Sequence, residues 1–266
     1  MPLLSTNMRI LHRGKVPYFI DLLRVLVDRN LKLMYKRSAL GIAWTLISPL
    51  LQLTVFAFVF QLVLPISIPR YASFAFTGLL VWTWFQNSLF QATGVIIANR
   101  PLIRQPGFPT PILPIVIVTT GLIHFLLALP VLIIFLLIDG VELEPVVLFL
   151  PILQVLQFAL TVSLSYLLAA LNVTFRDTQH TLGVLLQLFF YLTPIFYDSA
   201  NVPAEYQALY SLNPMVHIVN AYRDILMQGT QPDWLALLII AICILVLLPV
   251  GHYYFRRQSN RFVEEL

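Results

Sequence analysis

Six apolar stretches, each of roughly 20 residues or more, dominate this sequence and limit how the chain can fold. A helix that crosses a bilayer needs such a length of apolar residues, because its backbone must be hydrogen-bonded within the helix itself. The pattern predicts an all-α integral membrane protein with six transmembrane helices in one domain that covers residues 1–266. The expected spans are 41–64, 72–97, 112–138, 146–170, 181–198 and 234–254.

The composition favours a membrane protein over a water-soluble one. Hydrophobic residues make up 59% of the sequence and charged residues 11%, whereas soluble domains carry about 25% charged residues. Cys243 is the single cysteine, which excludes an intrachain disulfide and a cluster of thiolate metal ligands. The N-terminal residues lack a short apolar core followed by small residues, so we expect no removable signal peptide.

The positions of lysine and arginine predict how the spans are oriented, because cytoplasmic segments are enriched in these residues. With the N-terminus in the cytoplasm, every lysine and arginine except Arg70 and Arg223 falls on the cytoplasmic side, and the acidic loop 139–145 falls outside. We therefore expect both termini in the cytoplasm. This sorting by side also argues against nucleic-acid binding as the reason for the net charge of +4.

Residues 18–36 are too polar to span and predict a separate amphipathic helix that lies in the membrane interface. Their charged residues follow one another at steps of three and four, which places them on one stripe of a helix. A plain positively charged anchor is the alternative. The stripe consists of Asp21, Arg24, Asp28, Lys32 and Lys36.

The segment 199–233 is external in this topology and predicts two short re-entrant helices rather than a free loop. A structureless connection of this length is uncommon, and apolar turns lie on both sides of Asn213 and Pro214, a helix-breaking pair. The alternative is an outer-surface cap without a role in transport. The residues expected near the outer mouth are Tyr206, Tyr210, Tyr222, Arg223 and Asp224.

Several spans carry uncharged polar residues at helical spacing, and each set keeps to one face. Polar groups that face lipid are costly, so we expect these faces to point inward, either as hydrogen-bonding contacts between helices or as the lining of a hydrated path for a hydroxyl-rich substrate. The sets are Thr45, Ser48 and Gln52; Thr83, Asn87 and Gln91; Gln154, Gln157, Thr161 and Ser165; and Gln187 with Tyr191.

The span interiors contain no Asp, Glu, Lys or Arg, which disfavours ion-driven transport, since coupled carriers place ionisable groups in the membrane. His124 is the one titratable candidate near a span centre, and packing between helices explains it more simply. Aromatic residues cluster in the second and fifth spans, where they form interfacial belts or stacking surfaces for sugar rings. These clusters are Trp82, Trp84, Phe85 and Phe90, and Phe189, Phe190, Tyr191, Phe196 and Tyr197.

No motif for an energy source or a reaction centre is found. A phosphate-binding loop requires G-x-x-x-x-G-K-[ST], but Gly14 and Lys15 are followed by Val16, and Arg9 stands where the first glycine should be. No H-E-x-x-H and no G-x-S-x-G occurs. The sequence therefore predicts no catalytic residues, no metal site and no ATP site in this chain.

A polar island, NVTFRDTQHT at 172–181, separates the fourth and fifth spans. Positive-inside sorting places it in the cytoplasm, so Arg176 and Asp177 are unsuited to a buried ion relay. No nucleophile or metal-binding set accompanies them. We interpret the island as a hinge that acts either as a structural cap or as a gating element.

Short motifs in a fixed order along nearly the whole chain resemble those of the type-2 ABC exporter permeases that export polysaccharides. The first is YKRSALGIAWTLISPLLQ at 35–52, where a basic and aromatic cluster precedes Leu-Gly, and Trp and Pro follow within the span. The others are FTGLLVWTWF (76–85), NRPLIRQPGFP (99–109), NVTFRDTQH (172–180), QLFFYLTPIFY (187–197) and LNPMVHIVNAYRDIL (212–226).

The resemblance implies a homodimer of multi-pass permeases in a bacterial inner membrane, bound to two cytosolic ATPase subunits that hold ATP and Mg²⁺. Such a complex would export a lipid-pyrophosphate-linked glycan of the O-antigen, capsule or teichoic-acid type. It also implies ATPase contacts through 18–36 and a coupling helix at 99–109, and arrival of the pyrophosphate near Lys36 and Arg37, where cations suit phosphate.

The resemblance, together with the polar and aromatic patterns, yields a set of candidate site residues. Arg223 is counted with the hinge residues as a gating or structural candidate. The candidates are Asp28, Lys32, Arg100 and Arg104 for ATPase coupling; Lys36 and Arg37 for the entrance; Trp82, Trp84, Phe85, Asn87, Gln91, Gln187 and Tyr191 for the glycan path; and Arg176, Asp177 and Arg223 for gating.

Two other functions fit the sequence less well. A type-2 ABC exporter of drugs or small lipids would share the fold, but surface glycan would survive its deletion. A membrane-embedded lipid-modifying enzyme would convert a lipid-linked substrate without ATP, and no motif supports it.

Overall fold

The computed structural model describes residues 15–36, 38–63 and 67–259, and within this part every regular element is helical. The predicted all-α fold is therefore confirmed. Arg37 and the basic residues Arg9, Arg13 and Arg261 lie outside the described residues. The long helices are α1 (Lys15–Met34), α2 (Trp44–Ala57), α3 (Tyr71–Ala98), α5 (Ile112–Ile138), α6 (Leu150–Thr174), α7 (Thr178–Tyr191) and α10 (Trp234–Ser259).

Short helices and turns complete the chain. A 3-10 turn leads into α2 and a π-helical segment extends it, so the apolar helical stretch runs continuously over Gly41–Val63. The short elements are η2 (Gly41–Ala43), η3 (Phe58–Val63), α4 (Arg100–Ile103), η4 (Pro145–Phe149), η5 (Ser199–Asn201), α8 (Ala204–Tyr210), α9 (Pro214–Arg223) and η6 (Asp224–Gln228).

Four helical stretches among the described residues are long and apolar enough to cross a membrane: Gly41–Val63, Ile112–Ile138, Pro145–Thr174 and Trp234–Ser259. They correspond to four of the six expected spans. The number of six spans and their orientation thus rest on the sequence argument. The structure explains why the other two expected spans differ from these four helices.

The expected spans 72–97 and 181–198 differ from the four for different reasons. The helix α3 is 28 residues long, but its middle carries Gln86, Asn87 and Gln91, and neighbouring helices rather than lipid surround most of it. The helix α7 has only 14 residues, a rise of about 21 Å, because an irregular segment that contains Pro194 follows it.

Two of the segments that connect the long helices contain short helices of their own. The expected coupling helix at 99–109 is helical only over Arg100–Ile103, because Pro106, Gly107 (φ 77°) and Pro109 stop it. In 199–233, α8 and α9 flank the Asn-Pro pair. The Asn213 side chain accepts a 3.0 Å hydrogen bond from the Met215 amide, which caps the N-terminus of α9.

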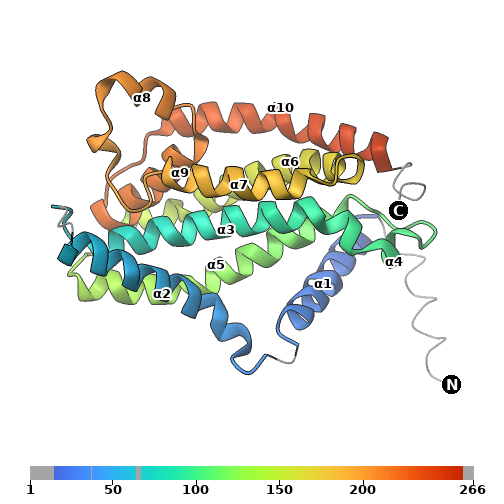
Figure 1. Cartoon of the computed structure of the whole chain (residues 1–266), viewed down its shortest axis with the longest axis horizontal. Coiled ribbons are helices and arrows are strands. Elements are labelled where there is room, and N and C mark those ends of the chain that lie inside the picture. The colour runs from blue at the N-terminus through green and yellow to red at the C-terminus, as the bar shows by residue number, and fades with distance from the viewer. Residues whose placement is uncertain (1–14, 37, 64–66, 260–266) are drawn as a thin grey trace.

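The helix α3 lies at the centre of the bundle, with α2, α5, α6, α7 and α9 packed around it (Figure 1). Its Phe76, Leu79 and Trp82 are among the least exposed residues of the protein. Close contact with α5 requires Gly121, since a Cβ there would overlap Ser88 Oγ and crowd the Trp84 ring. On the outer layers, α10 packs on α6, and α1 packs on α5.

A buried arginine ties three segments together at the end of the bundle where α3 begins. Arg223 is 3% exposed. Its Nη2 donates to the carbonyl oxygens of Phe74 (3.2 Å) and Ile195 (2.9 Å), and its Nε donates to Phe74 O (3.3 Å). The guanidinium carbon also lies 3.4 Å from the centroid of the Phe74 ring. One side chain therefore joins α9, α3 and the irregular segment after α7.

The surroundings of Arg223 are shaped to hold a charged guanidinium. A Cβ at Gly78 would lie 2.8 Å from Arg223 Nη2 and 3.0 Å from Ile195 O, so glycine leaves the space that the side chain fills. Burial lowers the pKa of Arg223 to about 9, and the Asp198 carboxylate opposes this shift. The guanidinium therefore stays charged at neutral pH.

We predict that Arg223→Met lowers stability, because buried carbonyl oxygens lose their donor. Each buried acceptor left unpaired costs about 1–3 kcal/mol. In a chain of this size each kcal/mol lowers the thermal unfolding midpoint by about 2–4 °C, so the midpoint in detergent should fall by roughly 2–12 °C. The matched control is Arg176→Met, since Arg176 is exposed. Equal midpoints for the two variants would contradict the structural role of Arg223.

Candidate functional site

The polar stripes of the first two expected spans meet in one cleft between α1, α2, α3 and α5. The cleft has a volume of about 240 Å³. Most of its polar groups are hydroxyls and amides from α2 and α3, and its far wall is formed by α5. The lining residues are Met34, Tyr35, Trp44, Thr45, Ser48, Pro49, Thr83, Asn87, Ser88, Gln91, Ile117, Gly121 and His124.

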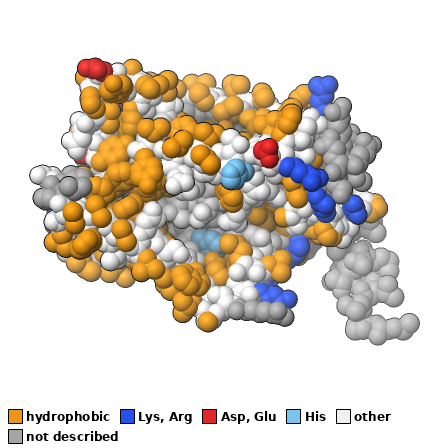
Figure 2. Space-filling model, viewed as in Figure 1, with side chains coloured by type: hydrophobic (Ala, Val, Ile, Leu, Met, Phe, Trp, Pro, Cys, Tyr) orange, Lys and Arg blue, Asp and Glu red, His pale blue; other side chains and the backbone are white. Residues whose placement is uncertain are grey.

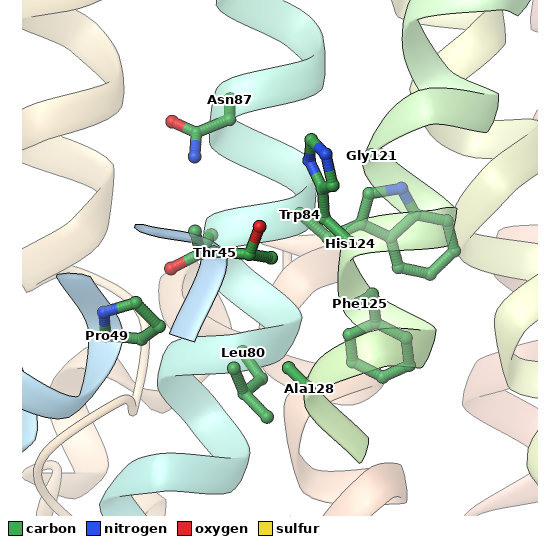
Figure 3. A pocket seen from close by; sticks show the side chains of 10 residues that line it. Thr45, Pro49, Leu80, Trp84, Asn87, Gly121, His124, Phe125 and Ala128 are labelled. Atoms are coloured by element: carbon green, nitrogen blue, oxygen red, sulfur yellow. The ribbon is translucent and has the colours of Figure 1, made fainter. Parts of the chain in front are cut away.

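The cleft narrows as it runs into the bundle. Its inner part has a volume of about 40 Å³ and shares Thr45, Thr83, Asn87 and His124 with the outer part. Figure 3 shows Thr45 and Pro49 on α2, Asn87 on α3, and His124 on α5 around this space, with the rings of Trp84 and Phe125 beside it. The inner end is thus closed by aromatic packing within this chain.

Tyr35, just after the end of α1, holds one wall of the cleft together. Its Oη lies 2.9 Å from Thr45 Oγ1 on α2 and 2.9 Å from His124 Nε2 on α5. The end of α1, the start of α2 and the distant helix α5 therefore meet at a single hydroxyl group.

A second hydrogen bond fixes α1 along α5. Asn30 Nδ2 donates to Thr120 Oγ1 at 3.2 Å. Thr120 and His124 are four residues apart, so they lie on the same face of α5, and α1 follows that face for about one turn. A displacement of α1 would therefore be transmitted to the wall of the cleft.

The chemistry of the cleft suits a ligand that carries hydroxyl groups. None of the residues that line it carries a formal charge when His124 is neutral. Hydroxyl and amide groups both donate and accept hydrogen bonds, and Ser88 Oγ is buried here without a hydrogen-bond partner among the described residues. The cleft offers polar contacts without the charge that an ion site requires.

The polar stripe of α6 lies outside the cleft, and its Gln157 serves helix packing, which is one of the two roles that the sequence allowed. Gln157 Nε2 donates to Val81 O at 2.9 Å and joins α6 to α3. Thr161 and Ser165 each donate to the carbonyl four residues earlier in α6. Gln52 is exposed outside the cleft.

The candidate glycan-path residues fall into three places. Asn87 and Gln91 line the cleft. Gln187 and Tyr191 are exposed on α7, away from it. The three aromatic candidates of α3, Trp82, Trp84 and Phe85, are 1%, 3% and 7% exposed and pack within the core; Trp84 also lines the inner part of the cleft.

The coupling and entrance candidates lie at the surface. Lys32 Nζ is 2.6 Å from Asp28 Oδ2, with both side chains exposed, so this ion pair contributes little to stability. Lys36 and Arg104 are exposed, while Arg100 is partly buried, and its Nε has no hydrogen-bond partner in the described part of the chain.

The hinge candidates Arg176 and Asp177 are exposed between α6 and α7. Asp177 occupies the N-cap position of α7, but its side chain makes no capping hydrogen bond. Asn172 does this instead, because its Oδ1 accepts from the Gln179 amide at 3.1 Å. The structural part of the hinge is therefore Asn172, a residue of the island whose role the sequence did not reveal.

Tyr35 and Asn30 are functional candidates that sequence reasoning missed. Tyr35 begins the first motif of the resemblance, which was the only available signal. Their partners lie 89 and 90 residues away on α5, and helical periodicity carries no information about such a distant pair.

Comparison with known proteins identifies the class of this bundle. The family model described as ABC-2 type transporter matches residues 21–227. The chain belongs to the ABC-2 type transporter family. It is a membrane subunit of a transporter and not an enzyme.

Relatives of this ABC-2 chain carry consistent names. The chain is 35% identical to the O-antigen export system permease protein RfbA of Myxococcus xanthus, over 92% of this chain and 95% of that protein. It is 33% identical to the protein of the same name from Klebsiella pneumoniae, over 97% of this chain and 100% of that protein. The polysialic acid transport protein KpsM of Escherichia coli is 26% identical over 87% and 91% of the two chains.

We predict that Tyr35→Phe loosens the end of α1, because the variant loses both contacts of the hydroxyl group while keeping the ring. Hydrogen exchange followed by mass spectrometry should show faster exchange of the amides at the C-terminal end of α1, by about threefold to tenfold. The control is Tyr18→Phe, which alters an exposed tyrosine of the same helix. Equal exchange in both variants would contradict the link.

Proposed function

We propose that this chain is the permease subunit of an ATP-driven ABC exporter that moves a lipid-pyrophosphate-linked polysaccharide out of the cytoplasm. The observation that carries the proposal is a cleft of uncharged hydroxyl and amide groups in a chain that is similar, along 97% of its length, to an O-antigen export permease. The glycan class is O-antigen, capsule or teichoic-acid type.

The cleft supports this proposal through its chemistry. A polysaccharide presents many hydroxyl groups that must keep hydrogen-bond partners as they leave water, since an unpaired polar group in an apolar layer is costly. Asn87, Gln91, Ser48 and Thr83 supply such partners from two adjacent helices. Hydrogen bonds to these side chains let a sugar chain pass, and they do not require an ion gradient.

Passage through the cleft needs either a second copy of the chain or an opening movement. The inner part, about 40 Å³, is far below the roughly 300–1,000 Å³ typical of ligand sites and is too small for a sugar ring. We propose a homodimer in which the cleft of each protomer faces a shared path. The exposed apolar residues of α2 and η3 are available for lipid or for the second copy: Leu51 and Val55 in α2, and Phe58 and Leu62 in η3.

The proposed topology has six spans, with α3 and α7 included and both termini in the cytoplasm of a bacterium. The Lys and Arg side chains on the visible face gather toward the end of the bundle that carries α4 and the last turns of α10, while hydrophobic side chains are spread over the rest of that face (Figure 2). This distribution supports an inner membrane protein with its basic end inside. The segment with α8 and α9 then forms re-entrant helices on the outer side.

The proposed energy source is a pair of separate ATPase subunits that bind at the basic end. The surfaces offered to them are α1, with Asp28 and Lys32, and the short coupling helix α4, with Arg100 and Arg104. ATP and Mg²⁺ belong to those subunits. Movement of α1 would reach the cleft through Tyr35, and Lys36 with Arg37 would meet the pyrophosphate of the lipid.

We predict that Asn87→Leu slows export, because the variant removes an amide from the cleft. The rate at which newly made polysaccharide reaches the cell surface, measured by pulse labelling and normalised to the amount of permease, should fall about threefold to tenfold. The matched control is Gln52→Leu, which removes an exposed amide of α2 outside the cleft. Equal rates in the two variants, or surface polysaccharide that survives deletion of the gene, would contradict the proposal.

A further inference from the structure

A second polar cavity lies between α9, η6 and the turn that precedes α8. These elements lie at the end of the bundle where α3 begins, opposite the end that carries α4 (Figure 1). Its volume is about 250 Å³. Most of its polar groups come from Asp198, His217, Asn220, Arg223, Asp224 and Gln228, and Ser199 and Asp233 also line it. None of them lines the cleft, and neither the polar stripes nor the aromatic clusters of the sequence predicted this assembly.

Many hydrogen-bonding groups in this cavity are unused by the protein. Asn220 Nδ2 donates to Ser199 Oγ at 3.2 Å, but the described residues give its Oδ1 no donor. Arg223 uses Nε and Nη2 for carbonyl oxygens, and no acceptor for its Nη1 is found in the described ranges. The side chains of Asp224 and Gln228 likewise make no hydrogen bond within this part of the chain.

The remaining two groups are only partly used. The Asp198 carboxylate accepts from the Ala200 amide at 2.9 Å through Oδ1, and its other oxygen is available. His217 Nε2 lies 2.8 Å from Ser211 O, which leaves Nδ1 for another partner. Burial raises the pKa of Asp224 to about 6, although the charge of Arg223 opposes the shift, as expected for a carboxyl group that lacks hydrogen-bond donors.

The mixture of groups restricts the ligand. A cluster of three or more His, Cys, Asp or Glu that could hold a metal ion is not found among the described residues. An anion is disfavoured, because the carboxylates Asp198, Asp224 and Asp233 outnumber the single guanidinium. Donors and acceptors alternate around a small space, and an alcohol matches both, since each hydroxyl group donates once and accepts twice.

We propose that this cavity binds one neutral sugar ring of the polysaccharide as the chain leaves the permease. Carboxylate, amide and guanidinium groups are planar, so each can contact two neighbouring hydroxyl groups of a ring at once. The volume is slightly below the 300–1,000 Å³ typical of sites for drug-sized ligands, which suits a single ring. This inference rests on the proposed function and adds to it a saccharide subsite that is separate from the cleft.

The subsite would act as a holding point on the outer side of the membrane. Arg223 is fixed by the same carbonyl oxygens that join α3, α9 and the segment after α7. A sugar bound to Nη1 would therefore contact the group that ties these segments together. Such contact resists backward movement of the polysaccharide between successive cycles of ATP hydrolysis.

The test uses photo-crosslinking in cells that make the full exporter and its polysaccharide. Gln228→p-benzoylphenylalanine places the crosslinker at the rim of the cavity, and Ser48→p-benzoylphenylalanine places it in the cleft. We expect both positions to capture polysaccharide. Asn220→Leu should lower capture at position 228 about fivefold, whereas the matched variant Asn201→Leu, an exposed asparagine nearby, should not.

The two proposals fail in different ways. Capture at position 48 without capture at position 228 would overturn the subsite and leave the exporter standing. The same conclusion would follow if Asn220→Leu left capture at position 228 unchanged, or if Asn201→Leu lowered it equally. Capture at neither position would overturn both. If Asn220→Leu also lowers capture at position 48, that variant damages the fold. Asp224→Leu then replaces it in the test, with the same expected fall in capture at position 228.

Discussion

The structure depends on the packing of a polar and aromatic helix, α3, inside a set of more apolar helices. Lipid cannot satisfy Gln86, Asn87 and Gln91, so this helix must be enclosed by protein or must line a hydrated space. The structure does both. One side of α3 forms the cleft with α2 and α5, and its N-terminal part, with Phe74 and Gly78, packs around Arg223.

The cleft and the second polar cavity therefore share one framework. Tyr35 joins α1 to the cleft wall, and the cleft runs beside α3, whose other end is held by Arg223. A movement of α1 thus has a physical route toward both polar spaces through hydrogen-bonded side chains. This arrangement suits a transporter whose energy arrives at one end of the bundle and whose substrate leaves at the other.

The sequence predicts the helical elements well, because runs of apolar residues and Asn-Pro or Pro-Gly signals act locally. The helices α5, α6 and α10, and the break between α8 and α9, lie where those signals place them. The sequence predicts poorly which aromatic side chains are buried. Lipid and protein core are equally apolar, so the pattern around Trp82 and Phe85 cannot tell a buried ring from an exposed one.

The polar sites are likewise only partly predictable from the sequence. The stripe containing Asn87 and Gln91 could be assigned to a path, since its spacing fixes one helix face. The Tyr35 contacts and the cavity around Arg223 join residues from distant segments, and only packing brings them together. The short α7 was also missed, because Pro194 ends a helix whose apolar composition continues beyond it.

The central claim is that this chain forms an ATP-driven path for lipid-linked polysaccharide. The direct measurement reconstitutes the purified chain with its ATPase subunits in liposomes that carry the lipid-linked polysaccharide, and follows cleavage by a membrane-impermeant glycosidase on the side opposite the ATPase. The account predicts that cleavable polysaccharide appears on that side only when ATP is hydrolysed. Polysaccharide that stays protected despite active hydrolysis, or that crosses equally well without this chain, would contradict it.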